Sequence, residues 1–156
     1  SLVGKVEESL DLVNEILQKI NTIKKKNFRI KPKIYFEEWD DPYISATRWV
    51  SEIIEISGGV DIFAKKSRSQ KALKRAVSSQ DVINKNPDII FASWCGKKVN
   101  FDKIKKRQGW SSINAVKTNS LFEIKSPIIL QPGPAALTDG LSQIHDLILQ
   151  WQKSQI

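Results

Sequence analysis

Four carboxylates in five residues make the segment EEWDD at 37–41 the first candidate for chemistry. A cluster of this kind could hold a metal ion or supply a general acid and base. If the segment ends a strand, alternation points Glu37 and Glu38 to opposite sides of the sheet, while Asp41 is placed to cap a following helix. At most two of the four acids then converge. An enzyme that uses these acids as metal ligands is a hypothesis that requires converging carboxylates.

Two tryptophans, Trp39 and Trp94, follow two runs of strand-forming residues. Trp39 belongs to the acidic segment, and Trp94 belongs to SWCGKK at 93–98. Together they could form a flat aromatic surface for a large planar ligand. Alternatively, one or both simply cover the end of a sheet, because tryptophan side chains are usually largely buried.

The single cysteine and the single histidine do not form a catalytic pair in the sequence. A thiol nucleophile needs a base, and His145 lies far along the chain in a predicted helix with no obvious acid to orient it. We expect Cys95 to be a small buried thiol and His145 to be a surface or boundary histidine. Two such ligands also fall short of the usual four of a zinc site. The sequence therefore predicts no metal site, no cofactor and no catalytic group.

Composition narrows the class of protein. A chain of 156 residues with 40% hydrophobic and 27% charged residues fits one globular domain and excludes collagen-like, mucin-like and disordered classes. The net charge of +8 suggests acidic partners, and the runs 65–75 and 97–107 are rich in lysine and arginine. Solvated helix faces explain such runs better than a nucleic-acid groove does, because a charge run alone has poor specificity. A basic nucleic-acid-binding domain with Trp94 as a stacking platform is the rival hypothesis.

Hydrophobic periodicity predicts the elements that must position these residues. Strands are expected at 33–37 and 88–93, and a hairpin is expected from 113–117 and 121–124. Helices are expected at 6–23, after Asp41 and Pro42, at 79–85 behind the capping box of Ser78 and Asp81, from Asn100 to 107, and at 137–151. Strands alternating with helices predict an α/β three-layer sandwich with a mostly parallel central sheet, preceded by a long helix. In such a sheet, ligands bind beyond the carboxyl ends of the strands, where both candidate segments fall.

Five strings in order carry a family resemblance. They are FEEWDDP at 36–42, RWVSEIIEISGG at 48–59, NPDIIFASWCGKK at 86–98, RQGW at 107–110 and EIKSPIILQPGPAALTDGL at 123–141. From about Lys31 to Trp151, the chain resembles the C-terminal lobe of the cobalamin and ferric-siderophore class of ABC-transporter substrate-binding proteins. In that class, two α/β lobes are joined by one long helix, and the ligand sits in the cleft between them.

The resemblance implies an organisation and a function. Residues 1–27 would be the connecting helix and 28–156 the C-terminal lobe, with the N-terminal lobe absent. The protein would not be an enzyme. It would capture a metal chelate for import, with a corrinoid such as cobalamin as the first choice and a ferric siderophore or haem as alternatives. The positions that match the ligand-contacting residues of the family are Glu38, Trp39, Trp94 and Lys97.

The resemblance also implies partners and a location. The protein would work with the membrane permease of an ABC transporter outside the cytoplasmic membrane, in the periplasm or an equivalent space, and no nucleic acid is expected. Many members dock through an acidic residue where this chain has Gln80, with Asp81 beside it, and many carry arginine where this chain has Ala135. A lobe without its partner lobe should expose an apolar patch, so self-association of the fragment is expected.

Overall fold

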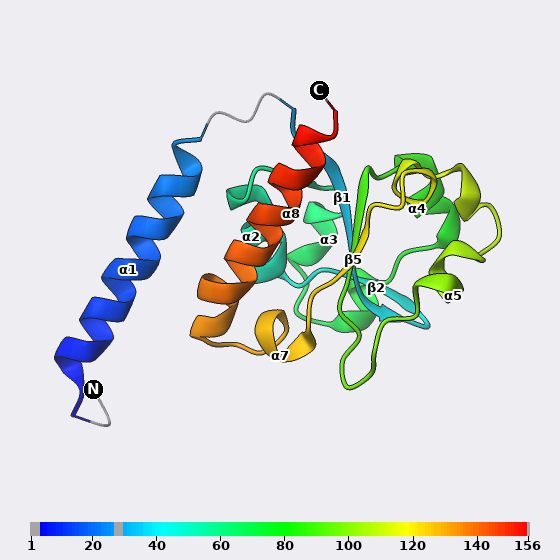
Figure 1. The fold of residues 1–156 in the computed structure, drawn as a ribbon. Helices are drawn as coiled ribbons and strands as arrows, with labels where there is room; N and C mark the ends of the chain where they lie inside the picture. Colours follow the sequence, from blue (N-terminus) through cyan, green and yellow to red (C-terminus); the bar gives the residue numbers. More distant parts are fainter. Residues whose placement is uncertain (1–3, 27–29, 156) are drawn as a thin grey trace.

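A computed structural model describes residues 4–26 and 30–155 and shows a three-layer α/β sandwich with one long helix at its side (Figure 1). The elements in chain order are α1 (Val6–Lys24), β1 (Lys33–Asp40), β2 (Tyr43–Ser45), α2 (Arg48–Ile56), β3 (Val60–Asp61), α3 (Ala64–Ser67), η1 (Ala72–Arg75), α4 (Ser79–Lys85), β4 (Ile89–Ala92), α5 (Phe101–Lys105), η2 (Trp110–Ser112), α6 (Asn114–Lys117), β5 (Leu121–Glu123), α7 (Ser126–Ile129), η3 (Ala136–Gly140) and α8 (Leu141–Lys153). The fold class expected from the sequence is confirmed.

The central sheet has the strand order β2, β1, β4, β5, and β3 pairs with the start of β1. β1 runs parallel to β3 and β4, and β4 runs parallel to β5, whereas β2 folds back antiparallel on the end of β1. Ala92 of β4 lies opposite Glu37 of β1 and Glu123 of β5. The carboxyl ends of these three strands therefore share one edge of the sheet, called the carboxyl edge below.

Helices cover both faces of the sheet, and strand alternation divides the core accordingly. Ile34 and Phe36 pack into a cluster with residues of α2, α7 and α8, whereas Tyr35 packs into a second cluster with residues of α4, α5 and α6. Every residue of β4, Ile89–Ala92, is buried. Coverage on both faces explains why this strand is a continuous apolar run rather than an alternating one.

The long helix α1 lies beside the layer formed by α2 and α8 (Figure 1). Ile23 is its buried anchor, and the Lys19 Nζ donates a hydrogen bond to the Thr138 carbonyl oxygen at 3.1 Å. Most of the apolar stripe that predicted the helix is uncovered, with about half of each of these side chains exposed: Val6, Leu10, Val13 and Leu17.

The predicted helix start at Asp41 and Pro42 is wrong. These two residues form the turn between β1 and β2, and the helix begins only at Arg48, after Thr47 in an extended conformation. Tyr43 and the next two residues, which lie between this turn and the helix, pair with the end of β1. Sheet pairing therefore overrides the helix-start signal of an aspartate followed by proline.

The predicted hairpin at 113–124 is also wrong. Asn114–Lys117 forms one helical turn, and β5 pairs with β4 in parallel rather than with the preceding segment. The backbone of this turn is tied to the start of β4, because the Asn114 N–H donates to the Asn86 Oδ1 and the Ala115 N–H donates to the Pro87 carbonyl. Short apolar runs do not separate one helical turn from a strand.

Candidate functional site

The two candidate segments meet at the carboxyl edge. β1 ends at Asp40, and Trp94 lies just beyond the end of β4. The Lys97 Nζ lies over both tryptophans, 4.2 Å from the ring centroid of Trp39 and 5.0 Å from that of Trp94. Three of the four residues expected to contact a ligand are therefore neighbours in the fold.

Glu37 forms the floor of this group and is 0% exposed. It accepts a hydrogen bond from the Tyr35 hydroxyl at 3.1 Å, one from the Trp94 Nε1 at 3.0 Å and two from the Arg107 guanidinium at 2.6 and 2.9 Å. Burial and the neighbouring Glu37 raise the pKa of Tyr35 well above its usual value, so the phenol stays a donor. Trp94, only 3% exposed, is thus a supporting residue below the surface.

The Arg107 side chain holds the Glu37 carboxylate in position. Its guanidinium carbon lies 4.2 Å from the ring centroid of Tyr43 and 4.4 Å from that of Trp110. Burial alone would lower the pKa of Arg107, but the hydrogen bonds and charge of Glu37 raise it. A planar cation held by two rings and a bidentate carboxylate has little freedom to move.

Asp40 holds two lysines at the surface. Its side chain is 1% exposed, and its two oxygens accept hydrogen bonds from the Lys97 Nζ at 2.5 Å and the Lys103 Nζ at 2.6 Å. Burial alone would raise the pKa of Asp40, but the hydrogen bonds and charges of Lys103 and Lys97 lower it. The hydrogen bond and charge of Asp40 also raise the pKa of Lys103. Each of these two pKa shifts favours the charged form of the Asp40–Lys103 pair, and Lys97 binds the other oxygen of Asp40.

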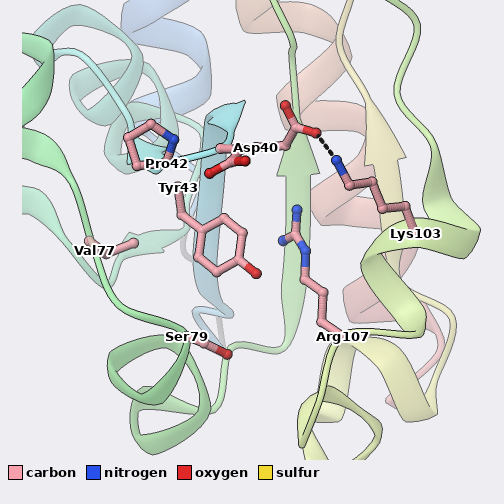
Figure 2. Close-up of a pocket in the computed structure, with 8 residues that line it drawn as sticks. Asp40, Pro42, Tyr43, Val77, Ser79, Lys103 and Arg107 are labelled. Carbon is pink, nitrogen blue, oxygen red and sulfur yellow. Dashed lines mark hydrogen bonds and ion pairs between the residues drawn. The ribbon is translucent and has the colours of Figure 1, made fainter.

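A pocket of about 400 Å³ opens beside this group. Figure 2 shows Lys103 and Arg107 on one side of it and Tyr43, Val77 and Ser79 on the other, with the dashed line marking the ion pair between Lys103 and Asp40. The walls thus combine an aromatic ring, a hydroxyl and charged groups. Ligand sites typically mix apolar surface with a few placed polar groups in this way.

Glu38 does not join the group. It accepts two hydrogen bonds from Arg75, of 2.8 and 2.9 Å. The burial of Glu38 raises its pKa despite the opposing effect of Arg75. Glu38 lines a different pocket of about 530 Å³ beside the start of α2. The opposite orientation of Glu37 and Glu38 agrees with strand alternation.

The acids of the segment 37–41 do not gather around a common point. Glu37 pairs with Arg107, Glu38 with Arg75, and Asp40 with the two lysines. Within residues 4–26 and 30–155, no three histidine, cysteine or acidic side chains are grouped so that they could hold a metal ion. The group of metal ligands that the enzyme hypothesis requires is not found in these residues.

The expected docking residues Gln80 and Asp81 lie exposed in the first turn of α4. The capping box is confirmed, because the Ser78 hydroxyl accepts from the Asp81 N–H at 3.0 Å and the Asp81 carboxylate accepts from the Ser78 N–H at 3.2 Å. The Gln80 amide donates to the Asn84 Oδ1 at 2.8 Å. Asp81 therefore has a structural task that accounts for its position, and any docking role would be additional.

The predictions for Cys95 and His145 are wrong. Cys95 is exposed in the turn after β4, because the neighbouring Trp94 fills the buried position. His145 is buried, with its Nδ1 3.3 Å from the Ser57 carbonyl oxygen and its Nε2 3.0 Å from the Lys26 Nζ. Burial lowers the pKa of His145.

Lys103 and Arg107 were not identified from the sequence as site residues. Both come from the segment that begins at α5, and their spacing of four residues is the spacing that brings side chains to one side of a helix. This spacing is a local signal that two cations share one side of a helix, but it does not identify the distant acids with which they pair.

The fold and this edge define an α/β protein with a candidate ligand site beyond the carboxyl ends of its parallel strands. A family model described as periplasmic binding protein matches residues 1–128, so the chain belongs to the periplasmic binding protein family. Within the part of the chain that the structure describes, no helix is both long and apolar enough to cross a membrane.

Relatives confirm the resemblance to substrate-binding proteins. An uncharacterized ABC transporter substrate-binding lipoprotein of Bacillus subtilis, YvrC, is 24% identical over 139 residues, which are 87% of this chain and 40% of that protein. The periplasmic heme-binding protein RhuT of Roseiflexus is similar with a TM-score of 0.71 and 20% identity over 94% of this chain and 59% of its own. The periplasmic vitamin B12 binding protein BtuF of Vibrio cholerae is similar with a TM-score of 0.65 and 24% identity over 90% of this chain and 52% of its own. The chain thus spans about half the length of the proteins that it matches.

Proposed function

We propose that this chain forms one lobe of the substrate-binding component of an ABC importer and captures a metal chelate against a second lobe. The observation that carries the proposal is the gathering of Trp39, Trp94, Lys97 and Lys103 around the buried Asp40 at the carboxyl edge. Ligands of open α/β sheets bind beyond this edge. The chelate is transported cargo rather than a resident cofactor, and the protein is not an enzyme.

The uncovered face of α1 supports the two-lobe organisation. An amphipathic helix normally buries its apolar stripe, and here the stripe of Val6, Leu10, Val13 and Leu17 is about half exposed. The chain covers only 59% and 52% of the two structural relatives. In the proposal, residues 1–27 connect to a further lobe, 28–156 form the C-terminal lobe, and the further lobe covers part of α1. Alone, the chain is expected to self-associate through this face.

The ligand is a metal chelate, for which a corrinoid is the first candidate and a ferric siderophore or haem are the alternatives. The relatives named for haem and for vitamin B12 have the same fold, so the fold does not choose between these ligands. Half-buried Trp39 is the tryptophan of this edge that a ring system would reach first, because Trp94 lies beneath the surface. Contact through Glu38 would require the ligand to extend toward the second pocket.

The partner in this proposal is a membrane permease on the outer side of the cytoplasmic membrane. The curated relative is named as a lipoprotein of such a transporter, which supports an extracytoplasmic location. Docking through Gln80 and Asp81 is compatible with their exposure on α4. A charge-reversed Asp81→Lys variant should weaken permease binding, while the same change at exposed Asp146 on α8 should not.

Titration of tryptophan fluorescence with cobalamin, haem and a ferric siderophore, corrected for absorbance, tests the proposal. Saturable quenching by one chelate that is lost in Trp39→Phe and kept in Trp151→Phe would support it. Trp151 is the control because it lies near the opposite edge of the sheet, where the amide of the neighbouring Gln152 donates to the Ile30 carbonyl oxygen just before β1. A single lobe should bind weakly, so ligand is taken to the high micromolar range. Quenching only by a single-stranded oligonucleotide, abolished by salt, would replace the proposal with nucleic-acid binding.

A further inference from the structure

We propose that Lys97 and Lys103 form a preorganised anion-binding pair, so that this site selects an anionic metal chelate over a neutral one. The inference rests on the proposed function and specifies the charge of its ligand, and it therefore places an anionic ferric siderophore or haem ahead of the uncharged corrinoid that the resemblance put first. It assigns Lys103 to the ligand contact and makes Asp40 the residue that positions both cations.

The first step is the local charge. Asp40 is 1% exposed, whereas the side chains of Lys97 and Lys103 are 42% and 54% exposed. The negative charge is therefore beneath the surface and the two positive charges are on it. The neighbouring acids Glu37 and Glu38 are each paired with an arginine. An incoming group at this point meets a net positive surface.

The second step is the restraint on the two ammonium groups. Lys97 is held by Asp40 and by the faces of both tryptophans, and the Lys103 Nζ lies 5.9 Å from the Trp94 ring centroid. A free lysine loses much rotamer freedom when it is fixed. Here that loss has already occurred on folding, so binding an anion costs less. Each lysine ammonium has three N–H donors. Each donates one hydrogen bond to Asp40, which leaves its other donors for a ligand.

The third step concerns the aromatic surface. The Lys97 ammonium lies directly over Trp39, and Trp94 is 3% exposed. A ring system that stacks on these tryptophans must first displace a cation from its carboxylate. Carboxylate or catecholate oxygens can instead bind the ammonium groups where they stand. Asp41 lines the neighbouring pocket and is the acid that opposes an anion there. The site therefore favours anionic oxygen atoms near the lysines and away from Asp41.

Two gallium(III) chelates of matched metal and similar size test the inference: the anionic tris-catecholate and the neutral tris-hydroxamate. Neither is paramagnetic, so binding to the intact chain can be followed by NMR through the indole N–H signal of Trp39. We expect the anionic chelate to bind about tenfold more tightly. Lys103→Gln should remove most of that advantage, Lys103→Arg should retain it, and Lys117→Gln should leave it unchanged. Lys117 ends α6, four residues before β5, and so lies toward the opposite edge of the sheet.

Both Lys103 substitutions leave Lys97 paired with Asp40, which protects the fold, and far-UV circular dichroism checks that each variant is folded. Equal or tighter binding of the neutral chelate would overturn the charge preference while leaving the proposed function intact. An equal loss of both chelates in Lys103→Gln would overturn the assignment of Lys103 as an anion contact. Failure of both chelates, together with cobalamin and haem, to bind would overturn the proposed function and this inference with it.

Discussion

Replacing Arg107 with methionine should destabilise the protein severely. The change leaves Glu37, which is 0% exposed, without its counter-charge and with two of its four hydrogen bonds. Removing one partner of a buried ion pair costs about 3–5 kcal/mol, against a total stability of about 5–15 kcal/mol for a typical domain. With a urea dependence of about 2 kcal/mol per molar, the midpoint of unfolding should fall by about 2 M.

Urea unfolding followed by far-UV circular dichroism measures this loss without depending on Trp110, whose fluorescence the Arg107 substitution would alter. Arg48→Met is the matched control, because Arg48 pairs with Glu52 on the exposed surface of α2. Its loss should be below about 1 kcal/mol. The double variant Glu37→Gln with Arg107→Met should recover part of the stability, because no unpaired buried charge remains. An Arg107→Met midpoint as high as that of Arg48→Met would refute the assignment of this pair as the floor of the site.

Three further predictions concern single groups. Ser78→Ala should lower the free energy of unfolding by about 1 kcal/mol at pH 7. Because hydrogen bonds from Ser78 lower the pKa of Asp81, this loss of stability should shrink as the pH falls below about 4. A loss of stability that does not change with pH would contradict the prediction. Burial raises the pKa of Asp61, so the charged form of Asp61 destabilises the fold as the pH rises above about 4. In thermal unfolding, the Asp61→Asn variant should therefore gain stability relative to the natural chain between pH 4 and 7. A difference in stability between the two chains that stays constant with pH would contradict this. Exposed Cys95 should react with a thiol reagent in the folded protein within a few-fold of its rate in urea, and strong protection would show that the turn is closed.

The sequence predicted the elements whose signals are local. The capping box of Ser78 and Asp81 defined the start of α4, and the Asn100 side chain caps α5 by accepting from the Lys103 N–H at 2.9 Å. The apolar run Ile89–Ala92 predicted a strand buried on both faces. These signals depend on residues within one turn or one strand, so a single sequence is sufficient to interpret them.

The sequence did not predict the pairing of side chains that lie far apart along the chain. Arg107 is 70 residues from Glu37, and Lys103 is 63 residues from Asp40. Their pairing depends on α5 being placed beside the ends of β1 and β4, and no local pattern records that placement. The hairpin of β1 and β2 was missed for a different reason. Its partners, such as Trp39 and Ile44, are close in the sequence, but an aspartate followed by a proline is typical of a turn as well as of a helix start.

Only three of the four site residues expected from the resemblance lie together, and the position of each residue determines its role. Trp94 donates to Glu37 beneath the surface, so its replacement should damage the fold before it affects a ligand. Trp39 lies at the rim, where the Trp39 Nε1 donates to the Asp41 carbonyl oxygen at 2.9 Å and fixes the ring. Because the Lys97 ammonium covers that ring, what a ligand meets at the carboxyl edge is a pair of fixed cations on an aromatic base rather than two open aromatic faces. Charge should therefore decide ligand choice at this edge more than ring size does.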